Sequence, residues 1–250
     1  MKNNEGIKSF ITFCRDQLSS HKEASDYLQE RKISQQSIED FELGVFSLSQ
    51  LDDLPAGCKE ELIQHGILFQ NEKDKSYFTL ACPCNSNSIM FPFYNAYKEL
   101  VAISFRPIIA NKVIKEHKIR KYWHTSFLKR FFLYGLYRIP NQVDNIIVGE
   151  GQFDVITAHQ YGFKNVIAVC GVALTDKHIS AISKRTTEAI IMFDGDKAGL
   201  SAIEKTENLK KVGGIELKKS ILPTGEDIDS FLHNYGAEKF KEILNAVQPV

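Results

Sequence analysis

The chain has 250 residues, which is enough for one large domain or two small ones around a substantial core. Hydrophobic residues make up 43% and charged residues 25%, so the composition is that of a globular protein and excludes a disordered chain. The formal net charge is +0, no apolar stretch approaches the roughly 18–20 residues of a membrane span, and no secretory signal is visible, so we expect a cytoplasmic protein without a membrane partner.

The first part of the chain predicts a mixed helical and β scaffold. Apolar residues at Ile7, Phe10, Cys14 and Leu18 have helical spacing and would form one buried stripe. The same patterns, with their turn residues, predict helices over 7–18, 24–31, 35–41 and 59–65, a hairpin over 67–80, and strands over 89–94 and 100–105. A solvated face is expected to contain Lys22, Glu23, Glu30, Arg31 and Lys32.

A basic block follows these strands. Residues 101–140 hold nine Lys and Arg and one acid, Glu116, so this segment is +8 and the rest of the chain is −8. Such a block in a neutral protein indicates one surface that faces a polyanion. The aromatic residues interleaved with it are Tyr122, Trp123, Phe127, Phe131 and Phe132. They fit a nucleic-acid groove with stacking faces, but equally a surface loop with rings turned into the core.

From residue 141 strand-like and helix-like runs alternate, which predicts an α/β domain with a parallel sheet and a domain boundary near residue 140. The predicted strands are 145–148, 165–169, 189–193 and 216–222. The predicted helices are 152–161, 175–184, 197–211 and 237–247.

Acidic residues follow three of these strands at one expected edge of the sheet. Glu150 follows the first strand, Asp194 and Asp196 follow the third, and Asp227 and Asp229 follow the fourth. Carboxylates that meet in one crevice repel one another, and a hard divalent cation with oxygen ligands relieves that repulsion. The sequence therefore predicts a metal site here.

Each feature also has a plainer interpretation. Asp154 taken singly is better explained as a helix cap, whereas caps alone are the less favoured account of Asp194 with Asp196. His159 and His178 are expected on helix surfaces, and Cys170 is expected to be a small buried hydrophobe. The five cysteines are scattered, and Cys82-Pro83-Cys84 is the only close pair, so we expect reduced thiols and no structural zinc.

Two motifs resemble the Toprim domain shared by topoisomerases and DnaG-type primases: Gly149-Glu150-Gly151-x-x-Asp154 and Asp194-Gly195-Asp196-x-Ala198-Gly199. Further landmarks, in order along residues 20–235, are similar to DnaG-type primases in particular. These landmarks are Tyr27-Leu28-x-x-Arg31, Ile89-x-Phe-Pro92, Phe105-Arg106, Lys121-Tyr122, Leu133-Tyr134-Gly135 and Leu222-Pro-x-Gly225-x-Asp227-x-Asp229.

The resemblance implies an α+β basic subdomain over 1–140, followed over 141–250 by a Toprim domain with a Rossmann-like parallel sheet flanked by helices. It implies a DNA primase that copies single-stranded DNA into short RNA primers from NTPs, using Mg²⁺ or Mn²⁺, with two or more ions. Glu150, Asp194 and Asp196 would be catalytic and would hold metal, with Asp227 and Asp229 extending the site; Glu150 is also a candidate general base. Arg106, Lys121 and Tyr122 fall where the family lines its template and nucleotide groove. The basic run adds Lys118, Arg120, Lys129 and Arg130 as expected contacts.

Neither the zinc ribbon nor the helicase-binding domain of bacterial primases has a counterpart here, so a split or minimal primase is expected. Its expected partner, acting in trans, is a replicative helicase or a separate zinc-containing template-recognition protein. The rival interpretations are a metal-dependent Toprim nuclease, which the same carboxylates could serve, and a non-catalytic nucleic-acid-binding replication subunit. A topoisomerase would need a further large domain that carries a nucleophilic tyrosine.

Overall fold

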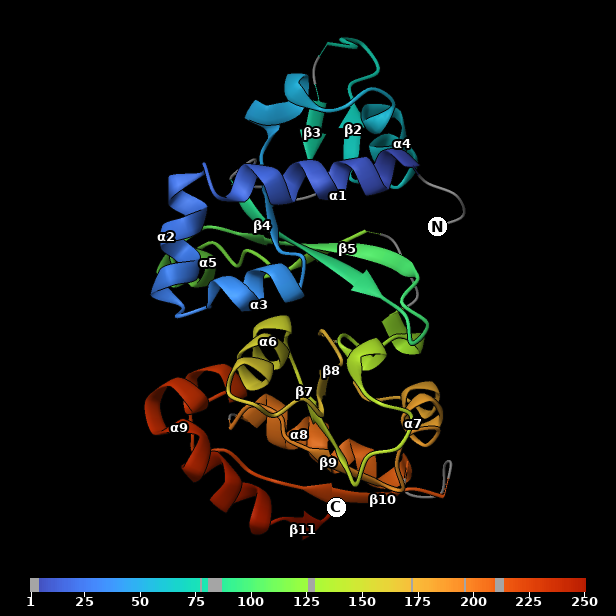
Figure 1. Ribbon diagram of the computed structural model, residues 1–250, viewed down its shortest axis with the longest axis vertical. Coiled ribbons are helices and arrows are strands. Elements are labelled where there is room, and N and C mark those ends of the chain that lie inside the picture. Colours follow the sequence, from blue (N-terminus) through green and yellow to red (C-terminus); the bar gives the residue numbers. More distant parts are fainter. Residues whose placement is uncertain are drawn as a thin grey trace. The chain divides into compact units, whose positions relative to one another are not determined.

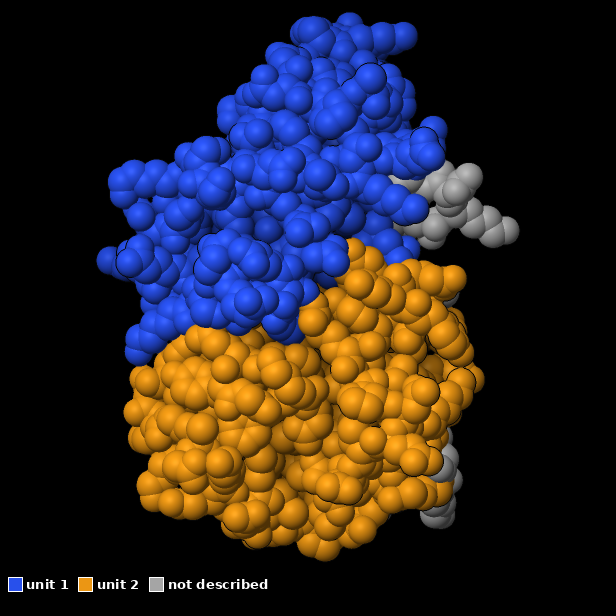
Figure 2. Space-filling view, viewed as in Figure 1, with its two compact units in different colours: residues 1–93, 100–127 blue, residues 94–99, 128–250 orange. Residues whose placement is uncertain are grey.

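The computed structural model describes residues 5–76, 78–80, 87–125, 129–171, 173–195, 197–209 and 214–250. Asp196, both cysteines of the close pair (Cys82 and Cys84) and Phe127 lie outside the described residues. The chain divides into two compact units, residues 1–93 with 100–127 and residues 94–99 with 128–250 (Figure 2). Along the described parts of the chain, no helix combines the length and apolar character needed to cross a membrane.

Four helices of unit 1 form where the apolar spacing predicts them: α1 (Glu5–Leu18), α2 (Lys22–Glu30), α3 (Gln35–Asp40) and α4 (Cys58–Gln64). The stripe of α1 is buried, and Ile7, Phe10 and Cys14 have no exposed surface. The helix approaches β1 (Gly44–Phe46) so closely that a Cβ on Gly44 would lie 2.6 Å from the carbonyl carbon of Cys14.

The sheet of unit 1 has the strand order β1-β4-β5-β6. Its long strands β4 (Ser88–Tyr94) and β5 (Leu100–Pro107) confirm the two predicted strands, and β2 (Leu68–Gln70) pairs with β3 (Phe78–Leu80) as the predicted hairpin. The sequence did not predict β1, the two-residue β6 (Trp123–His124) or the short helix α5 (Asn111–Glu116). Elements this short carry too little periodicity to be recognised.

The sheet of unit 2 has the order β11-β10-β9-β7-β8 (Figure 1). Its strands β7 (Ile146–Gly149), β8 (Val166–Ala168), β9 (Glu188–Ile191) and β10 (Glu216–Lys219) are parallel, with Val148 opposite both Ile167 and Ile191. This arrangement confirms the α/β fold class. The short strand β11 (Gln248–Pro249) adds an antiparallel edge.

The helices of unit 2 are α6 (Gln152–Gln160), α7 (Asp176–Ile182), α8 (Lys197–Lys205) and α9 (Ile228–Asn245). The predicted helix over 197–211 changes to a 3₁₀ turn at Thr206–Leu209. Helix α9 is interrupted at Gly236, which has φ 79° and ψ 175°, so the predicted helix over 237–247 is its second half. The sequence analysis assigned no helix to the first half, where it identified only the acids Asp227 and Asp229.

Residues 128–140, which the sequence assigned to the first domain, belong to unit 2. Tyr134 and Ala168 exchange two main-chain hydrogen bonds, of 2.9 and 3.1 Å, and thereby extend the β8 edge of the sheet. The β4–β5 turn, residues 94–99, also belongs to this unit. The guanidinium of Arg185 donates to the carbonyl oxygens of Ala96 and Ile139, so one side chain ties both segments to the sheet.

Candidate metal centre and basic groove

Asp154 organises the turn that follows β7. Its Oδ2 accepts hydrogen bonds from the main-chain N–H of Gly151 at 2.7 Å and of Glu150 at 3.2 Å. Asp154 stands in the first turn of α6, where N–H groups lack helical partners and a carboxylate is favoured. The capping interpretation of Asp154 is therefore confirmed, and the cap fixes the position from which Glu150 leaves the strand.

Glu150 and Asp194 come together at the carboxyl ends of adjacent parallel strands. The main-chain N–H of Asp194 donates to Oε1 of Glu150 at 3.0 Å. Both residues are partly exposed, so both carboxylates lie at the surface of the sheet edge. Asp196, the third predicted acid, lies outside the described residues.

The acidic segment 226–229, which contains the predicted Asp227 and Asp229, reaches the same edge. The N–H of Gly195 donates to the carbonyl oxygen of Glu226 at 3.1 Å. A Cβ at Gly195 would lie 2.3 Å from the carbonyl oxygen of Pro223, so only glycine permits this approach. Asp227 is the N-cap of α9, where its Oδ1 accepts from the N–H of Ser230 at 2.7 Å.

The acids around Asp154 raise its proton affinity. Burial, and then the charges of Asp227, Asp194 and Asp229, raise the pKa of Asp154 well above its ordinary value. Oxygen donors that repel one another in this way fit a hard divalent cation. Among the described residues, which leave out Asp196, no three His, Cys, Asp or Glu side chains converge closely enough to hold an ion.

The five acids at this edge differ in how far their side chains are exposed to solvent. Glu150, Asp194 and Asp227 are partly exposed, whereas Asp154 and Asp229 are 5% and 8% exposed. Asp154 binds main-chain N–H groups through both of its oxygens, because Oδ1 accepts from the N–H of Asp229 at 3.3 Å. Glu150, Asp194 and Asp227 are thus the acids of this edge that remain partly open to solvent.

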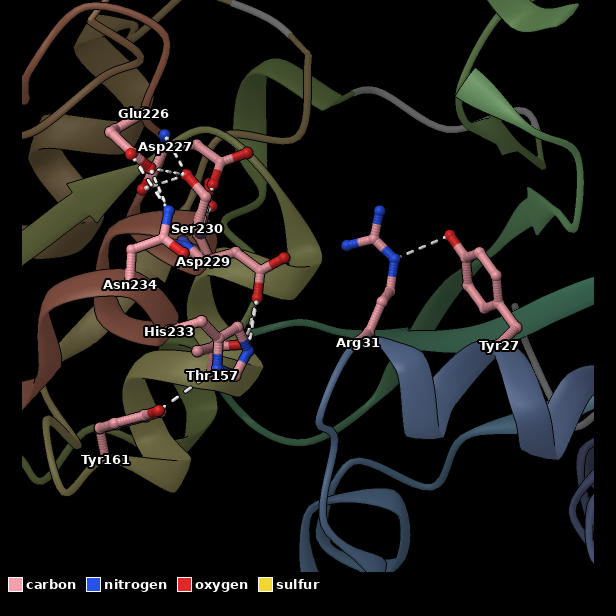
Figure 3. A network of polar contacts seen from close by, with 11 residues as sticks. Tyr27, Arg31, Thr157, Tyr161, Glu226, Asp227, Asp229, Ser230, His233 and Asn234 are labelled. Atoms are coloured by element: carbon pink, nitrogen blue, oxygen red, sulfur yellow. Dashed lines mark hydrogen bonds and ion pairs between the residues drawn. The ribbon is translucent and has the colours of Figure 1, made fainter. Parts of the chain in front are cut away.

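A groove in unit 1 is lined in part by Arg106, the first basic residue of the block. Arg106 is 3% exposed, and its guanidinium carbon lies 5.1 Å from the ring centre of Tyr122. Arg106 lines an open hollow of about 850 Å³ together with Arg31 and Tyr27. Nε of Arg31 donates to the hydroxyl oxygen of Tyr27 at 2.9 Å (Figure 3). The groove is therefore lined by two arginines and Tyr27, and Tyr122 lies against Arg106 without lining the groove.

The sequence interpretation of this region as a solvated face holds for Lys22, whose side chain is 85% exposed, and Arg31 is partly exposed. Both residues line this groove, beside the acids Glu23, Asp26 and Glu30. The sequence signal for this groove was the spacing of Tyr27 and Arg31, which are four residues apart and therefore lie on one helical face.

The other predicted nucleic-acid contacts are divided between the units. Lys118, Arg120 and Lys121 are exposed in unit 1, and the guanidinium of Arg120 lies 5.5 Å from the ring centre of Trp123. In unit 2, Lys129 is partly buried and Arg130 is exposed, its guanidinium lying 5.1 Å from the ring centre of Phe131. Cation–aromatic pairs thus recur along the basic run.

The two helical histidines lie in the core of unit 2, so their expected surface position was wrong. His159 is 4% exposed, with Nε2 3.0 Å from the carbonyl oxygen of Val166. His178 is fully buried, with Nε2 2.9 Å from the carbonyl oxygen of Lys129. Cys170 is buried, as expected.

Comparisons with known proteins give consistent matches along the chain. Residues 13–139 match the DNA primase catalytic core, N-terminal domain, and residues 147–232 match a Toprim-like domain. A DNA primase of Haemophilus influenzae is 30% identical over 98% of this chain and 42% of its own length. The chain thus spans about two fifths of the curated relatives that it matches.

Solved structures agree in fold. The Aquifex aeolicus primase, solved with its zinc-binding and RNA polymerase domains, superposes with a TM-score of 0.82 at 25% identity, covering 98% of this chain and 60% of that one. A DnaG primase catalytic domain bound to single-stranded DNA gives a TM-score of 0.79 at 25% identity, covering 98% of this chain and 81% of that one.

Proposed function

Because the chain belongs to the DnaG-type DNA primase family, we propose that it synthesises short RNA primers on single-stranded DNA by metal-dependent nucleotidyl transfer. The observation that carries the proposal is the link between Glu150 and Asp194, which brings two acids of neighbouring strands together at the carboxyl edge of a parallel sheet. Asp227, anchored at the start of α9, adds a third carboxylate to this edge.

Glu150, Asp194 and Asp227 would hold Mg²⁺ or Mn²⁺, together with Asp196 as the sequence predicts. When bound, such ions lower the pKa of an attacking 3′-hydroxyl and neutralise charge on a triphosphate and its leaving pyrophosphate. The chain's own contribution is to fix the carboxylates. Asp154 fixes the turn of Glu150, and Oε1 of Glu150 fixes the main chain at Asp194.

The groove of unit 1 would contact template or nucleotide. Arg106 and Arg31 would supply cations for phosphate, and Tyr27 would supply an aromatic face beside them, while Tyr122 packs against Arg106. The relative solved with single-stranded DNA supports a template of this kind. Exposed Lys118, Arg120 and Lys121 would extend the basic surface of this unit.

The test is to incubate the chain with single-stranded DNA, labelled NTPs and Mg²⁺ or Mn²⁺, beside Asp194→Asn. We expect short RNA products from the wild-type chain and none from the variant, with DNA binding retained by both. Shortened DNA in place of RNA would identify a nuclease. An Asp194→Asn variant as active as wild type would refute the proposed site.

The curated relatives are more than twice as long as this chain. The replicative helicase or zinc-containing template-recognition partner expected from the sequence stays a prediction. Adding such a protein to the same assay tests it. An increase in the number of primers started would support the prediction, and unchanged initiation would count against it.

A further inference from the structure

A buried polar network joins α6 to α9 beneath the acidic edge of unit 2 (Figure 3). The hydroxyl of Thr157 donates to Oδ1 of Asp229 at 2.5 Å. Nε2 of His233 lies 3.3 Å from the same oxygen, and Nδ1 of His233 lies 3.3 Å from the hydroxyl oxygen of Tyr161. Two side chains thus approach one oxygen of Asp229, Thr157 by a hydrogen bond and His233 at 3.3 Å, and Tyr161 contacts the other nitrogen of His233.

The burial of these groups makes the contacts specific. Thr157 has no exposed surface, Asp229 is 8% exposed, and the side chain of His233 is 10% exposed. A carboxylate in such a place is costly unless it is hydrogen-bonded. The Tyr161 ring stands edge-on to the His233 ring, with centroids 5.7 Å apart and an interplanar angle of 71°, which fixes the imidazole.

The network holds a whole segment and not one side chain alone. The N–H of Asp229 donates to Oδ1 of Asp154, while its carboxylate is held by Thr157. Two residues earlier in the chain, Asp227 caps the same helix and is partly exposed. Fixing Asp229 on α6 therefore fixes the direction from which the Asp227 carboxylate leaves the helix.

We propose that Thr157 and His233 are positioning residues that lock the acidic segment 226–229 onto α6 in the arrangement that binds divalent ions. This inference rests on the proposed function, since it concerns the same ion site. Neither residue would contact the ion. Outer-shell partners of this kind typically change ion affinity by about 10- to 100-fold when they are removed.

The test measures Mn²⁺ affinity by calorimetry and by the electron paramagnetic resonance of free Mn²⁺, without DNA or nucleotide. Thr157→Val removes the hydroxyl at nearly constant volume, and we expect it to weaken Mn²⁺ binding about 10-fold. Thr157→Ser keeps a hydroxyl and should restore most of the affinity.

Thr186→Val is the matched control. Thr186 is also buried, and its hydroxyl donates to the carbonyl oxygen of Asp144 at 2.9 Å, near the opposite ends of the strands. We expect this variant to lower the melting temperature without changing Mn²⁺ affinity. A role of Thr157 in stability alone would give the two valine variants the same affinity, and that result would overturn the inference.

His233→Phe gives a second route should Thr157→Val fail to fold. It keeps a ring against Tyr161 and removes both nitrogens, so Mn²⁺ binding should weaken; wild-type affinity would overturn the inference. A wild-type chain that binds no Mn²⁺ would overturn the proposed metal-dependent function as well, whereas wild-type binding unchanged in these variants overturns only the role of the network.

Discussion

The main-chain N–H of Asp194 donates a hydrogen bond to Oε1 of Glu150 at 3.0 Å, across 44 residues of sequence. The two residues follow β7 and β9, whose parallel register places Val148 opposite Ile191. One carboxylate of the proposed ion site therefore sets the backbone of another. Substitutions of Glu150 can separate the effect of its charge from the effect of its hydrogen bond to Asp194.

Glu150→Gln keeps a carbonyl oxygen that can accept from Asp194, whereas Glu150→Ala removes the acceptor. We expect both variants to lose primer synthesis, because both lose the carboxylate charge. Only the alanine variant should also lose stability, by about 1–2 kcal/mol, as measured by urea denaturation. A glutamine variant that polymerises like the wild type would show that the Glu150 charge is not needed.

Gly195→Ala should damage the site through backbone displacement. The new Cβ would lie 2.3 Å from the carbonyl oxygen of Pro223, so the turn after β9 and the 222–226 loop must separate. We expect a loss of about 1–3 kcal/mol in the free energy of unfolding and weaker Mn²⁺ binding. Gly151→Ala is the control, since its Cβ meets nothing closer than Oδ2 of Asp154 at 3.5 Å. Equal losses in both variants would contradict the prediction.

Arg31→Ala should weaken binding of single-stranded DNA if the groove takes the backbone of the template. Loss of one phosphate contact should reduce the slope of log affinity against log salt by about 1. Fluorescence anisotropy of a labelled oligonucleotide across a salt series measures both effects. Arg15→Ala removes an arginine that lines a different hollow of unit 1. This variant should change neither the affinity for single-stranded DNA nor its salt dependence. A loss of the same size in both variants would exclude a specific role for the groove.

His178 should make stability depend on pH. Its Nδ1 accepts from the N–H of Thr175 at 3.3 Å, and its Nε2 faces the carbonyl oxygen of Lys129 at 2.9 Å, so only a neutral ring satisfies both contacts. Burial lowers the pKa of His178 below its ordinary value. This contribution to stability is therefore complete above about pH 6.5 and is lost as the pH falls toward the lowered pKa.

The measurement is the free energy of unfolding of wild type and His178→Gln between about pH 7.5 and pH 5. The wild type should lose more stability than the variant as the pH falls, and the difference isolates this histidine from the others. Parallel curves would mean that His178 does not titrate differently in the folded and unfolded states.

The sequence predicted the strands of unit 2 well because each is a short apolar run bounded by turn residues, as Ile146–Val148 is by Asn145 and Gly149. It also placed Glu150 and Asp194 at one edge, because parallel strands present their carboxyl ends together. The proximity of Glu150 and Asp194 follows from the parallel order of their strands, and the alternation of apolar strands and helices in the sequence predicts that order.

Tertiary hydrogen bonds are what the sequence could not supply. His178 was expected at a surface because histidine is polar, but its partner is a main-chain carbonyl 49 residues away. Asp229 was expected as a metal ligand, a role that stays untested, and its contact with Thr157 spans 72 residues. The groove that Arg31 lines was not predicted, because a helix pattern does not reveal which residues of other elements lie opposite it.

The division of the chain has a consequence for its biosynthesis. The β4–β5 turn belongs to unit 2, yet its partner Arg185 follows Ala96 by 89 residues. At ribosomal rates of about 5–20 residues per second, roughly 4–18 s pass between the synthesis of Ala96 and that of Arg185. Asn95 stabilises the turn during this interval, because its Oδ1 accepts hydrogen bonds from the N–H groups of Tyr97 and Glu99. The nascent hairpin can therefore keep its shape until the rest of unit 2 has emerged.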